Sequence, residues 1–158
     1  MIRVQQEDFD IGAEIAGLKA GRSDIGAIVA FVGTMRDRSS DQTVEEMTLE
    51  HYPGMTEAEL QRIESEARSR WPLQASLIVH RYGTLRPSDN IVLVVTASEH
   101  REAAFRAAEF LMDYLKSRAP FWKRVEAAGQ ADWVVAKPSD DSAADRWSKL
   151  PGRREAAE

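Results

Sequence analysis

The sequence predicts an α+β protein in which two long helices pack on mixed and antiparallel strands. Apolar runs rich in β-branched residues occur at residues 25–32, 75–82 and 90–97, and turn residues separate the last two runs. Two other stretches, residues 56–71 and 102–118, repeat apolar residues at helical spacing. Strands and helices do not alternate strictly, so hairpins in a mixed sheet fit better than a doubly wound α/β sheet.

Length and composition favour one globular domain over residues 1–149, followed by a polar tail at residues 150–158. The 158 residues are 43% hydrophobic and 30% charged, which is enough apolar mass for a core. No run approaches the roughly 18 consecutive apolar residues of a membrane span. The N-terminus lacks the basic and then apolar order of a signal peptide, so we expect a cytoplasmic protein.

The first elements are expected to be a short strand at residues 2–5 and a short helix that Asp10 caps and Gly21 ends. The run at residues 25–32 is almost continuously apolar, which predicts a strand covered on both faces. A polar loop is expected to follow at residues 37–42.

Residues 44–52 alternate enough to be a strand, and the next proline–glycine pair has the residues of a type II turn. Thr56 and Glu59 have the spacing of a capping box, which predicts the start of a helix that Pro72 ends.

The second half of the chain is predicted to begin with an antiparallel hairpin made of residues 75–82 and 90–97. The helix at residues 102–118 is expected to pack on the sheet through an apolar stripe of Phe105, Ala108, Leu111, Met112 and Leu115. A last strand at residues 133–137 and a short helix at residues 139–147 complete the predicted order.

The segment at residues 113–124 is the most informative one for function. It gathers four cations and three aromatic residues around Pro120, in a chain whose formal net charge is −5. Because proline stops the helix there, we expect a local anion pocket formed by Lys116, Arg118, Lys123 and Arg124.

The members of this cluster have different interpretations. Lys116 and Lys123 have aromatic neighbours that would desolvate an ammonium, so they are candidates for an acid, base, nucleophile or anion clamp. For Arg118, a helix-end cation that balances the helix dipole is the better interpretation. For Phe121 and Trp122, it is packing in the core.

Two other cationic clusters lie at the ends of predicted elements. Arg36 and Arg38 follow the first core strand, and His100 with Arg101 precedes the second long helix. The unpaired N–H groups at a helix start suit a phosphate or carboxylate. Alternatively, Arg101 caps sheet carbonyls and His100 is a solvated turn residue, and this pair alone slightly favours that alternative.

Absent residue types and motifs exclude several kinds of chemistry. Cysteine is absent, which removes disulfides, cysteine nucleophiles and thiolate metal sites. If the protein takes part in sulfur chemistry, another molecule has to bring the reacting sulfur. The three histidines lack the spacing of metal ligands, and we expect no metal and no cofactor. Neither a GxSxG elbow nor a phosphate-binding GxGxxG or Walker loop is present.

Six strings, in order along residues 2–147, together resemble one family, the large, catalytic subunits of molybdopterin synthase. The strings are GAIVAFVGTMRD, LEHYPGMT, ARSRWPL, HRYG, SEHR and DYLKSRAPFWKR. Each string alone is a weak signal, but six in register over nearly the whole chain are specific.

The resemblance implies a sulfurtransferase that converts cyclic pyranopterin monophosphate to molybdopterin by adding two dithiolene sulfurs, in molybdenum cofactor biosynthesis. It implies a small ubiquitin-like partner subunit whose C-terminal glycine carries the sulfur as a thiocarboxylate and whose tail enters a pocket of the large subunit. It also implies a central dimer of large subunits flanked by two small ones. The implied fold is an α/β hammerhead with an added antiparallel sheet.

The resemblance further implies roles for the residues that match its motifs. Lys116 and Lys123 correspond to the catalytic lysines. Substrate binding is implied for Thr34, Met35, Arg36, His100, Arg101, Lys116, Lys123, Arg124 and Val125. Lys137 matches a basic position that reaches towards the other subunit's site. The chain departs from the family pattern at Val125, where an acidic residue is usual, and at Glu99, where a smaller residue is usual.

Two alternatives to catalysis are open from the sequence. One is a non-catalytic module that binds a phosphorylated metabolite or single-stranded RNA through the same cations and Trp122. The acidic net charge and the lack of an extended basic stripe argue against RNA. The other is a structural subunit that keeps the partner pocket without activity, for which Val125 is the only sign.

Overall fold

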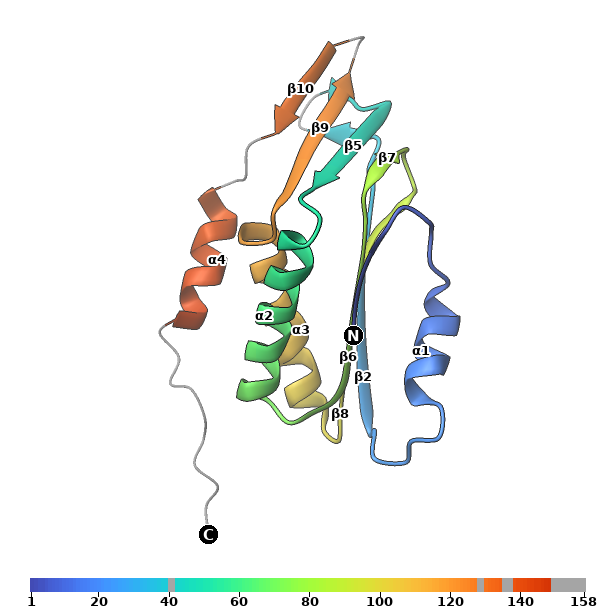
Figure 1. The fold of residues 1–158 in the computed structure, drawn as a ribbon, viewed down its shortest axis with the longest axis vertical. Helices are drawn as coiled ribbons and strands as arrows, with labels where there is room; N and C mark the ends of the chain where they lie inside the picture. The colour runs from blue at the N-terminus through green and yellow to red at the C-terminus, as the bar shows by residue number, and fades with distance from the viewer. Residues whose placement is uncertain (40–41, 128–129, 135–137, 149–158) are drawn as a thin grey trace.

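One four-stranded sheet forms the body of the molecule and carries helices on both faces (Figure 1). The computed structural model describes residues 1–39, 42–127, 130–134 and 138–148. The strand order is β1, β6, β8, β2, with the bounds Ile2–Gln5, Leu73–Arg81, Asn90–Ser98 and Ala27–Thr34. β1 runs parallel to β6, and the other two pairings are antiparallel.

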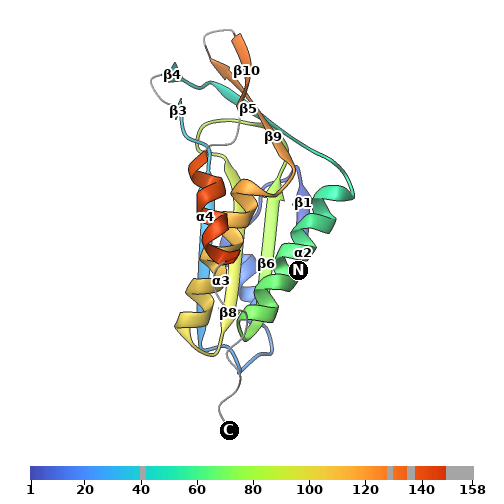
Figure 2. The same ribbon diagram turned by 90° about the vertical axis from the view of Figure 1, so that its left-hand side faces the viewer.

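A second sheet, fully antiparallel, stands at one end of the first (Figures 1 and 2). Its strand order is β10, β9, β5, β7, with the bounds Gln130–Val134, Phe121–Ala127, Glu46–His51 and Gly83–Leu85. The two short strands β3 (Arg38–Ser39) and β4 (Gln42–Thr43) pair with each other near it. A core cluster that includes residues of β5, β7 and β9 consists of Met35, Val44, Met47, Leu49, Leu85 and Val125.

The helices divide between the two faces of the first sheet. One face is covered by α1 (Ile11–Lys19), and the other by α2 (Met55–Arg70) and α3 (Arg101–Ser117). α4 (Pro138–Ser148) packs against α3 on the side away from the sheet. The larger core lies between the sheet and the last three helices, and its largest members include Leu60, Ile63, Phe110, Leu111 and Trp147. Of the described helices, none is long and apolar enough to cross a membrane.

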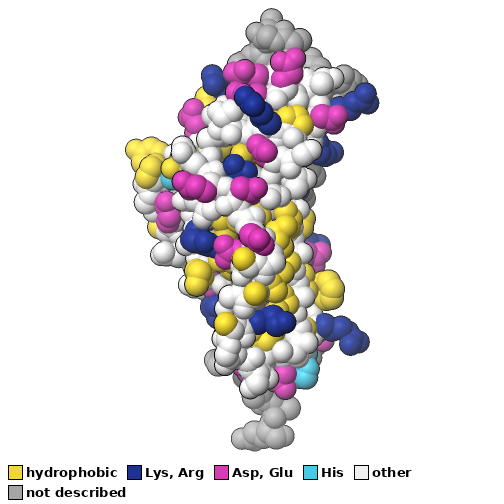
Figure 3. All heavy atoms as spheres, turned by 90° about the vertical axis from the view of Figure 1, so that its right-hand side faces the viewer, with side chains coloured by type: hydrophobic (Ala, Val, Ile, Leu, Met, Phe, Trp, Pro, Cys, Tyr) yellow, Lys and Arg dark blue, Asp and Glu magenta, His cyan; other side chains and the backbone are white. Residues whose placement is uncertain are grey.

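On the side of the molecule that carries α1, hydrophobic side chains form a band at mid-height (Figure 3). Acidic and basic side chains are intermixed around this band. The described residues of that face therefore offer no continuous basic path of the kind that a nucleic-acid backbone needs.

The predicted α+β class is confirmed, and so are most of the predicted elements. Asp10 Oδ1 accepts a hydrogen bond from the Ala13 N–H at 2.9 Å, as expected of the residue that caps α1. Gly21 follows with φ 69°, in the left-handed region where a helix commonly ends. β6 and β8 form the predicted antiparallel pair, and α2 and α3 are the two predicted long helices.

The prediction that the strand at residues 25–32 is covered on both faces is wrong. Among the described strands, this strand, β2, pairs only with β8 and lies at the edge of its sheet, and 40% of Phe31 is exposed. The predicted burial of Phe105 is also wrong, with 61% of this residue exposed. The side chains that α3 buries nearby are small, namely those of Ala103, Ala104, Ala107 and Ala108.

The predicted capping box of Thr56 and Glu59 is wrong as well. α2 begins at Met55, and the Gly54 N–H donates to the Glu57 carboxylate at 2.7 Å. The helix start is therefore capped two residues earlier than predicted, and the Thr56 hydroxyl bonds to other groups.

The predicted boundaries of other segments also changed. β9 was not predicted, because its residues alternate between apolar and charged side chains within what reads as a cationic cluster. Residues 37–42, predicted to be a loop, contribute to the β3–β4 pair. The strand predicted at residues 133–137 begins at Gln130, and its residues 135–137 lie outside the described part of the chain, as does the predicted tail at residues 150–158.

Candidate active site

Lys116 and Lys123 lie on either side of the joint between α3 and β9. Lys116 is exposed in the last turn of α3, and Lys123 is a half-buried residue of β9. Arg118 is the C-cap residue of α3, and its N–H donates to the Tyr114 carbonyl at 2.7 Å. Arg118 therefore has the helix-end position that the sequence predicted.

Lys123 is on the face of β9 that is turned towards the interior. In the pairing of β9 with β5, Lys123 lies opposite Leu49. Val125, on the same face of β9 as Lys123, lies opposite Met47. Leu49, Met47 and Val125 are all buried in the core cluster of the second sheet. Val125 is thus a core residue here, and an acidic side chain at this position would sit among hydrophobic neighbours.

The opposite face of β9 carries Trp122 and Arg124, because side chains alternate along a strand. Trp122 is 46% exposed, so the interpretation of Trp122 as a core residue is wrong. Arg124 Nη2 lies 3.8 Å from Glu126 Oε1, and Arg124 pairs across the sheet with the exposed Trp133. In one copy of the chain, Arg124 and Lys123 therefore point to different faces.

Phe121, the first residue of β9, packs against the larger core as predicted. Its ring stacks on the imidazole of His80, with 3.7 Å between the ring centroids and 17° between the ring planes. His80 Nδ1 lies 2.8 Å from the Arg81 carbonyl oxygen. Burial lowers the pKa of His80 from 6.5 to about 4, so this ring is neutral at pH 7.

The core cluster of the second sheet also positions the chain after β2. Met35 is 5% exposed and shares this cluster with Val125. The Met35 N–H donates to the Asp89 carbonyl, and the Met35 carbonyl accepts from the Ser88 N–H, both at 2.9 Å. The flanking residues Thr34 and Arg36 are exposed. The structure thus brings the residues after β2 to the same end of the molecule as β9.

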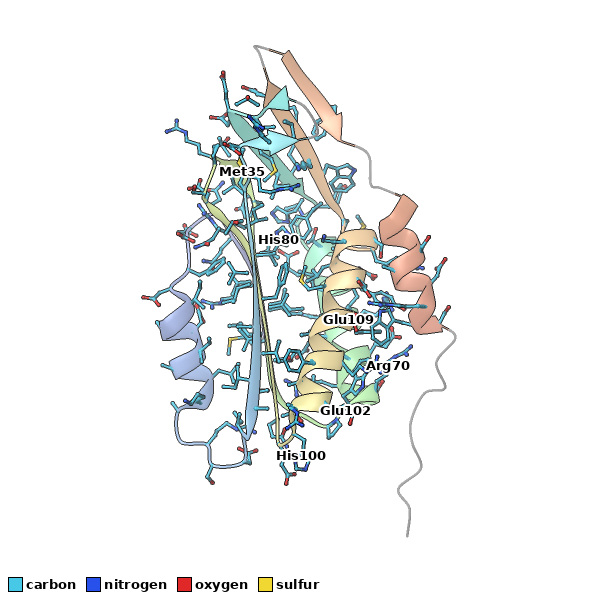
Figure 4. The ribbon with its side chains drawn as sticks, turned by 180° about the vertical axis from the view of Figure 1, so that it is seen from behind. Met35, Arg70, His80, His100, Glu102 and Glu109 are labelled. Atoms are coloured by element: carbon cyan, nitrogen blue, oxygen red, sulfur yellow. The ribbon has the colours of Figure 1, made fainter. Side chains whose placement is uncertain are left out.

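His100 and Arg101 lie at the other end of α3 from Lys116. Fifteen residues of α helix separate Arg101 from Lys116, which corresponds to about 22 Å. Figure 4 shows His100 and Met35 at opposite ends of the sheet. The His100 side chain is 82% exposed, and its Nε2 is 3.7 Å from the carboxylate of Glu99, which is also exposed. One copy of the chain does not bring His100 and Arg101 together with Arg36 and the lysines.

An apolar groove of about 650 Å³ between β2 and α3 was missed by the sequence reasoning. Its lining includes Phe31, Phe105 and Met112. Met112 is one helical turn before Lys116, so the groove follows the face of α3 that leads to this lysine. The groove depends on the position of β2 at the edge of its sheet. An apolar run in the sequence does not show whether a strand lies at an edge or in the middle of a sheet, so no signal for the groove was available in the sequence.

Other predicted features have different outcomes. Tyr114 is 8% exposed in the larger core, so it packs in the core and does not form a free wall for Lys116. Lys137 lies outside the described residues. Within the described ranges, no three His, Asp or Glu side chains form a group that could hold a metal ion.

Comparison with known proteins gives a consistent set of relatives. A family model described as MoaE protein matches residues 4–118. The molybdopterin synthase catalytic subunit of Mesorhizobium japonicum is 55% identical over 148 residues, which are 92% of each chain. That of Escherichia coli K12 is 50% identical over 147 residues, 92% of this chain and 97% of the relative. The solved MoaE protein of Burkholderia ambifaria is 49% identical and superposes with a TM-score of 0.81, covering 95% of this chain and 99% of the other.

Proposed function

Because the chain belongs to the MoaE family of molybdopterin synthase catalytic subunits, we propose that it converts cyclic pyranopterin monophosphate into molybdopterin. Relatives that are half identical along more than nine-tenths of the chain are catalytic subunits, so the non-catalytic alternatives lose their support. The proposal includes a cytoplasmic location and a small partner subunit that delivers sulfur as a C-terminal thiocarboxylate.

One observation carries the assignment of the active site. Two lysines flank a single joint, and the same core cluster that lies beside Lys123 also fixes the segment that bears Arg36. Three cations from three different segments are thus gathered at one end of an acidic protein. Such an arrangement suits an anionic substrate together with an anionic sulfur donor.

The chemistry assigned to the lysines follows from the charges that the reaction develops. The thiocarboxylate sulfur attacks a carbon of the substrate and a carbon–sulfur bond forms, so that the partner becomes an acyl thioester. The carbon–oxygen bond at that substrate carbon breaks, and its oxygen leaves either as water or as an oxygen of the phosphate. Water then attacks the acyl carbonyl carbon, the carbon–sulfur bond to the partner breaks, and the partner leaves as a carboxylate. Lys116 and Lys123 stabilise the negative charge of these steps, and one of them donates a proton. The sequence of steps occurs twice to give the dithiolene.

The other residues proposed for the site bind the substrate or support the residues that do. Arg36 binds the phosphate end of the substrate. Thr34 and Met35 hold Arg36 in place, with Met35 anchored in the core. Val125 packs beside Lys123 on the same face of β9, and Arg124 contributes from the opposite face.

His100 and Arg101 enter this site from a second copy of the chain. The exposed edge of β2 can pair in an antiparallel manner with β2 of another copy around a two-fold axis. Such pairing sets the Ala27 end of one strand beside the Thr34 end of the other. Within one copy, Ala27 pairs with Ser98, so His100 and Arg101 lie near the Ala27 end of β2.

The dimensions of the two elements agree with this arrangement. β2 spans about 24 Å, and Arg101 is about 22 Å from Lys116 along α3. A second copy paired along β2 therefore offers its His100 and Arg101 close to the first copy's Arg36. The exposed Phe31 and the groove beside it are then covered by the second copy.

An assay of product tests the proposed function. Purified chain is mixed with cyclic pyranopterin monophosphate and thiocarboxylated partner, and the dithiolene product is measured. The wild-type chain is expected to form product, and Lys116→Ala and Lys123→Ala are each expected to form far less. Normal product formation by both variants would contradict the proposal.

A further inference from the structure

The linker between the two lysines is short and tightly turned. It passes from the C-cap of α3 through Ala119 and Pro120 into β9, and the Phe121 N–H donates to the Ala119 carbonyl at 2.8 Å. Any movement of this linker changes the separation between Lys116 and Lys123. The contacts that hold the linker therefore decide the geometry of the lysine pair.

The Thr56 hydroxyl makes one of these contacts. It donates to the Pro120 carbonyl at 3.2 Å and accepts from the Tyr52 N–H at 3.1 Å. Thr56 is 0% exposed, so both backbone groups depend on the hydroxyl at that point. Since Gly54 and Glu57 cap α2, the hydroxyl is not needed to start the helix. Its position instead connects the turn after β5 with the linker.

The imidazole of His80 makes the second contact. It stacks on Phe121 at a centroid distance of 3.7 Å, directly after Pro120 in the chain. His80 Nδ1 faces the Arg81 carbonyl at 2.8 Å, so Nδ1–H donates and the ring orientation is fixed by its own strand. The low pKa of His80, about 4, keeps the ring uncharged near the two lysines.

We propose that Thr56 and His80 are positioning residues that clamp the linker at residues 119–121 and thereby set the separation of Lys116 and Lys123. The inference rests on the proposed function, because the separation of the two lysines matters only if both act in the proposed reaction. Neither residue touches the reacting atoms. Thr56 holds the backbone of the linker from α2, and His80 holds its first β9 side chain from β6.

Three variants of threonine test the clamp. Thr56→Val has nearly the same shape and removes the hydroxyl, whereas Thr56→Ser keeps the hydroxyl. Thr84→Val is the matched control, because Thr84 is exposed on β7, away from the linker. At saturating substrate and thiocarboxylated partner, Thr56→Val is expected to slow product formation roughly 10- to 100-fold, with the KM values for both unchanged. Thr56→Ser and the control should stay within about twofold of wild type.

A double-mutant cycle separates positioning from general weakening of the fold. If Thr56 acts through the lysines, Thr56→Val adds little in a Lys123→Ala background. An equal loss in both backgrounds overturns the inference, as does a wild-type rate in Thr56→Val, or a loss that appears only in KM.

A second pair of variants keeps the inference testable if Thr56→Val does not fold. His80→Phe retains a ring that can stack on Phe121, and His80→Leu removes it. We expect the rate at saturation to be close to wild type for His80→Phe and clearly lower for His80→Leu, and equal rates for the two overturn the inference. Failure of the proposed function itself is recognised separately, because Lys116→Ala and Lys123→Ala would then be active.

Discussion

The two ends of α3 are built in different ways. At the C-terminal end, Lys116 is followed by a linker that a buried hydroxyl and a stacked imidazole hold in place. At the N-terminal end, the His100 side chain is 82% exposed, and its neighbour within ion-pair distance is Glu99, which is also exposed. The chain by itself thus fixes one half of the candidate site and leaves the other half on its surface.

This difference indicates where each half finds its ligand. Exposed polar and charged side chains contribute little to folding stability, so His100 and Arg101 are not explained by stability alone. We call the C-terminal end, with these two contacts, the rigid end; the proposed reaction needs its lysines in a fixed geometry relative to two reactants. In the proposed dimer, the N-terminal end becomes part of a site when a second copy places it beside Arg36.

The largest expected effect is on the rigid end. Lys116→Ala and Lys123→Ala should each lower product formation by at least about 100-fold, because each removes a charge that stabilises the transition state. Binding of the thiocarboxylated partner, measured separately by calorimetry, should change much less. Equal activity of both variants and wild type would remove the basis of the comparison.

The next effect is on the exposed end. Arg101→Ala should lower kcat/KM by roughly 10- to 100-fold, mainly through KM, because one charge-assisted contact to the phosphate is lost. Arg62→Ala is a suitable control, since Arg62 is an exposed cation of α2 that pairs with Glu59. A loss for Arg62→Ala as large as that for Arg101→Ala would show that the exposed end has no special role.

The clamp predicts how stability depends on pH. In the unfolded state, His80 takes up a proton as the pH falls below 6.5. In the folded state, His80 is protonated only near its lowered pKa of about 4. Stability therefore falls as the pH drops from 6.5 to 4, and the share due to His80 is about 2 kcal/mol between pH 7 and pH 5. Urea unfolding at the two pH values measures it. The loss should be smaller by that amount in His80→Phe, and an identical loss in both proteins would contradict this environment for His80.

The smallest effect is expected on the outer face of β9. Arg124→Ala should reduce activity by less than about fivefold, because Arg124 points away from Lys123 and lies near Glu126. The product assay used for Lys123→Ala gives a direct comparison. A loss as large as that for Lys123→Ala would mean that both faces of β9 serve one site.

Much of the fold could be predicted because local signals agreed with the final structure. α1 begins after Asp10 and ends before Gly21, as expected, and the two long helices lie where the apolar spacing predicted them. Local patterns could not reveal which strand would lie at an edge, because β2 is apolar along its whole length. The same limit explains Phe105, whose exposure depends on how α3 is rotated against the sheet.

The candidate site shows a similar division. The lysines could be found from the cations and aromatic residues around Pro120, and the structure gives each a definite place. The separation of His100 and Arg101 from them depends on the length and direction of α3, which a list of motifs does not contain. The role of Thr56 was hidden because its spacing to Glu59 is also that of a capping box, whereas the helix is capped by Gly54 and Glu57.

A complementation assay tests most directly whether two copies share one site. Lys116→Ala chains and Arg101→Ala chains are mixed in equal amounts, allowed to exchange subunits, and assayed with thiocarboxylated partner and with substrate well below the wild-type KM. If each site takes its lysine from one copy and its arginine from the other, half of the dimers are mixed and each mixed dimer has one intact site. The mixture then recovers about a quarter of wild-type activity, although each variant alone is nearly inactive. No recovery, with subunit exchange verified, would contradict the shared site.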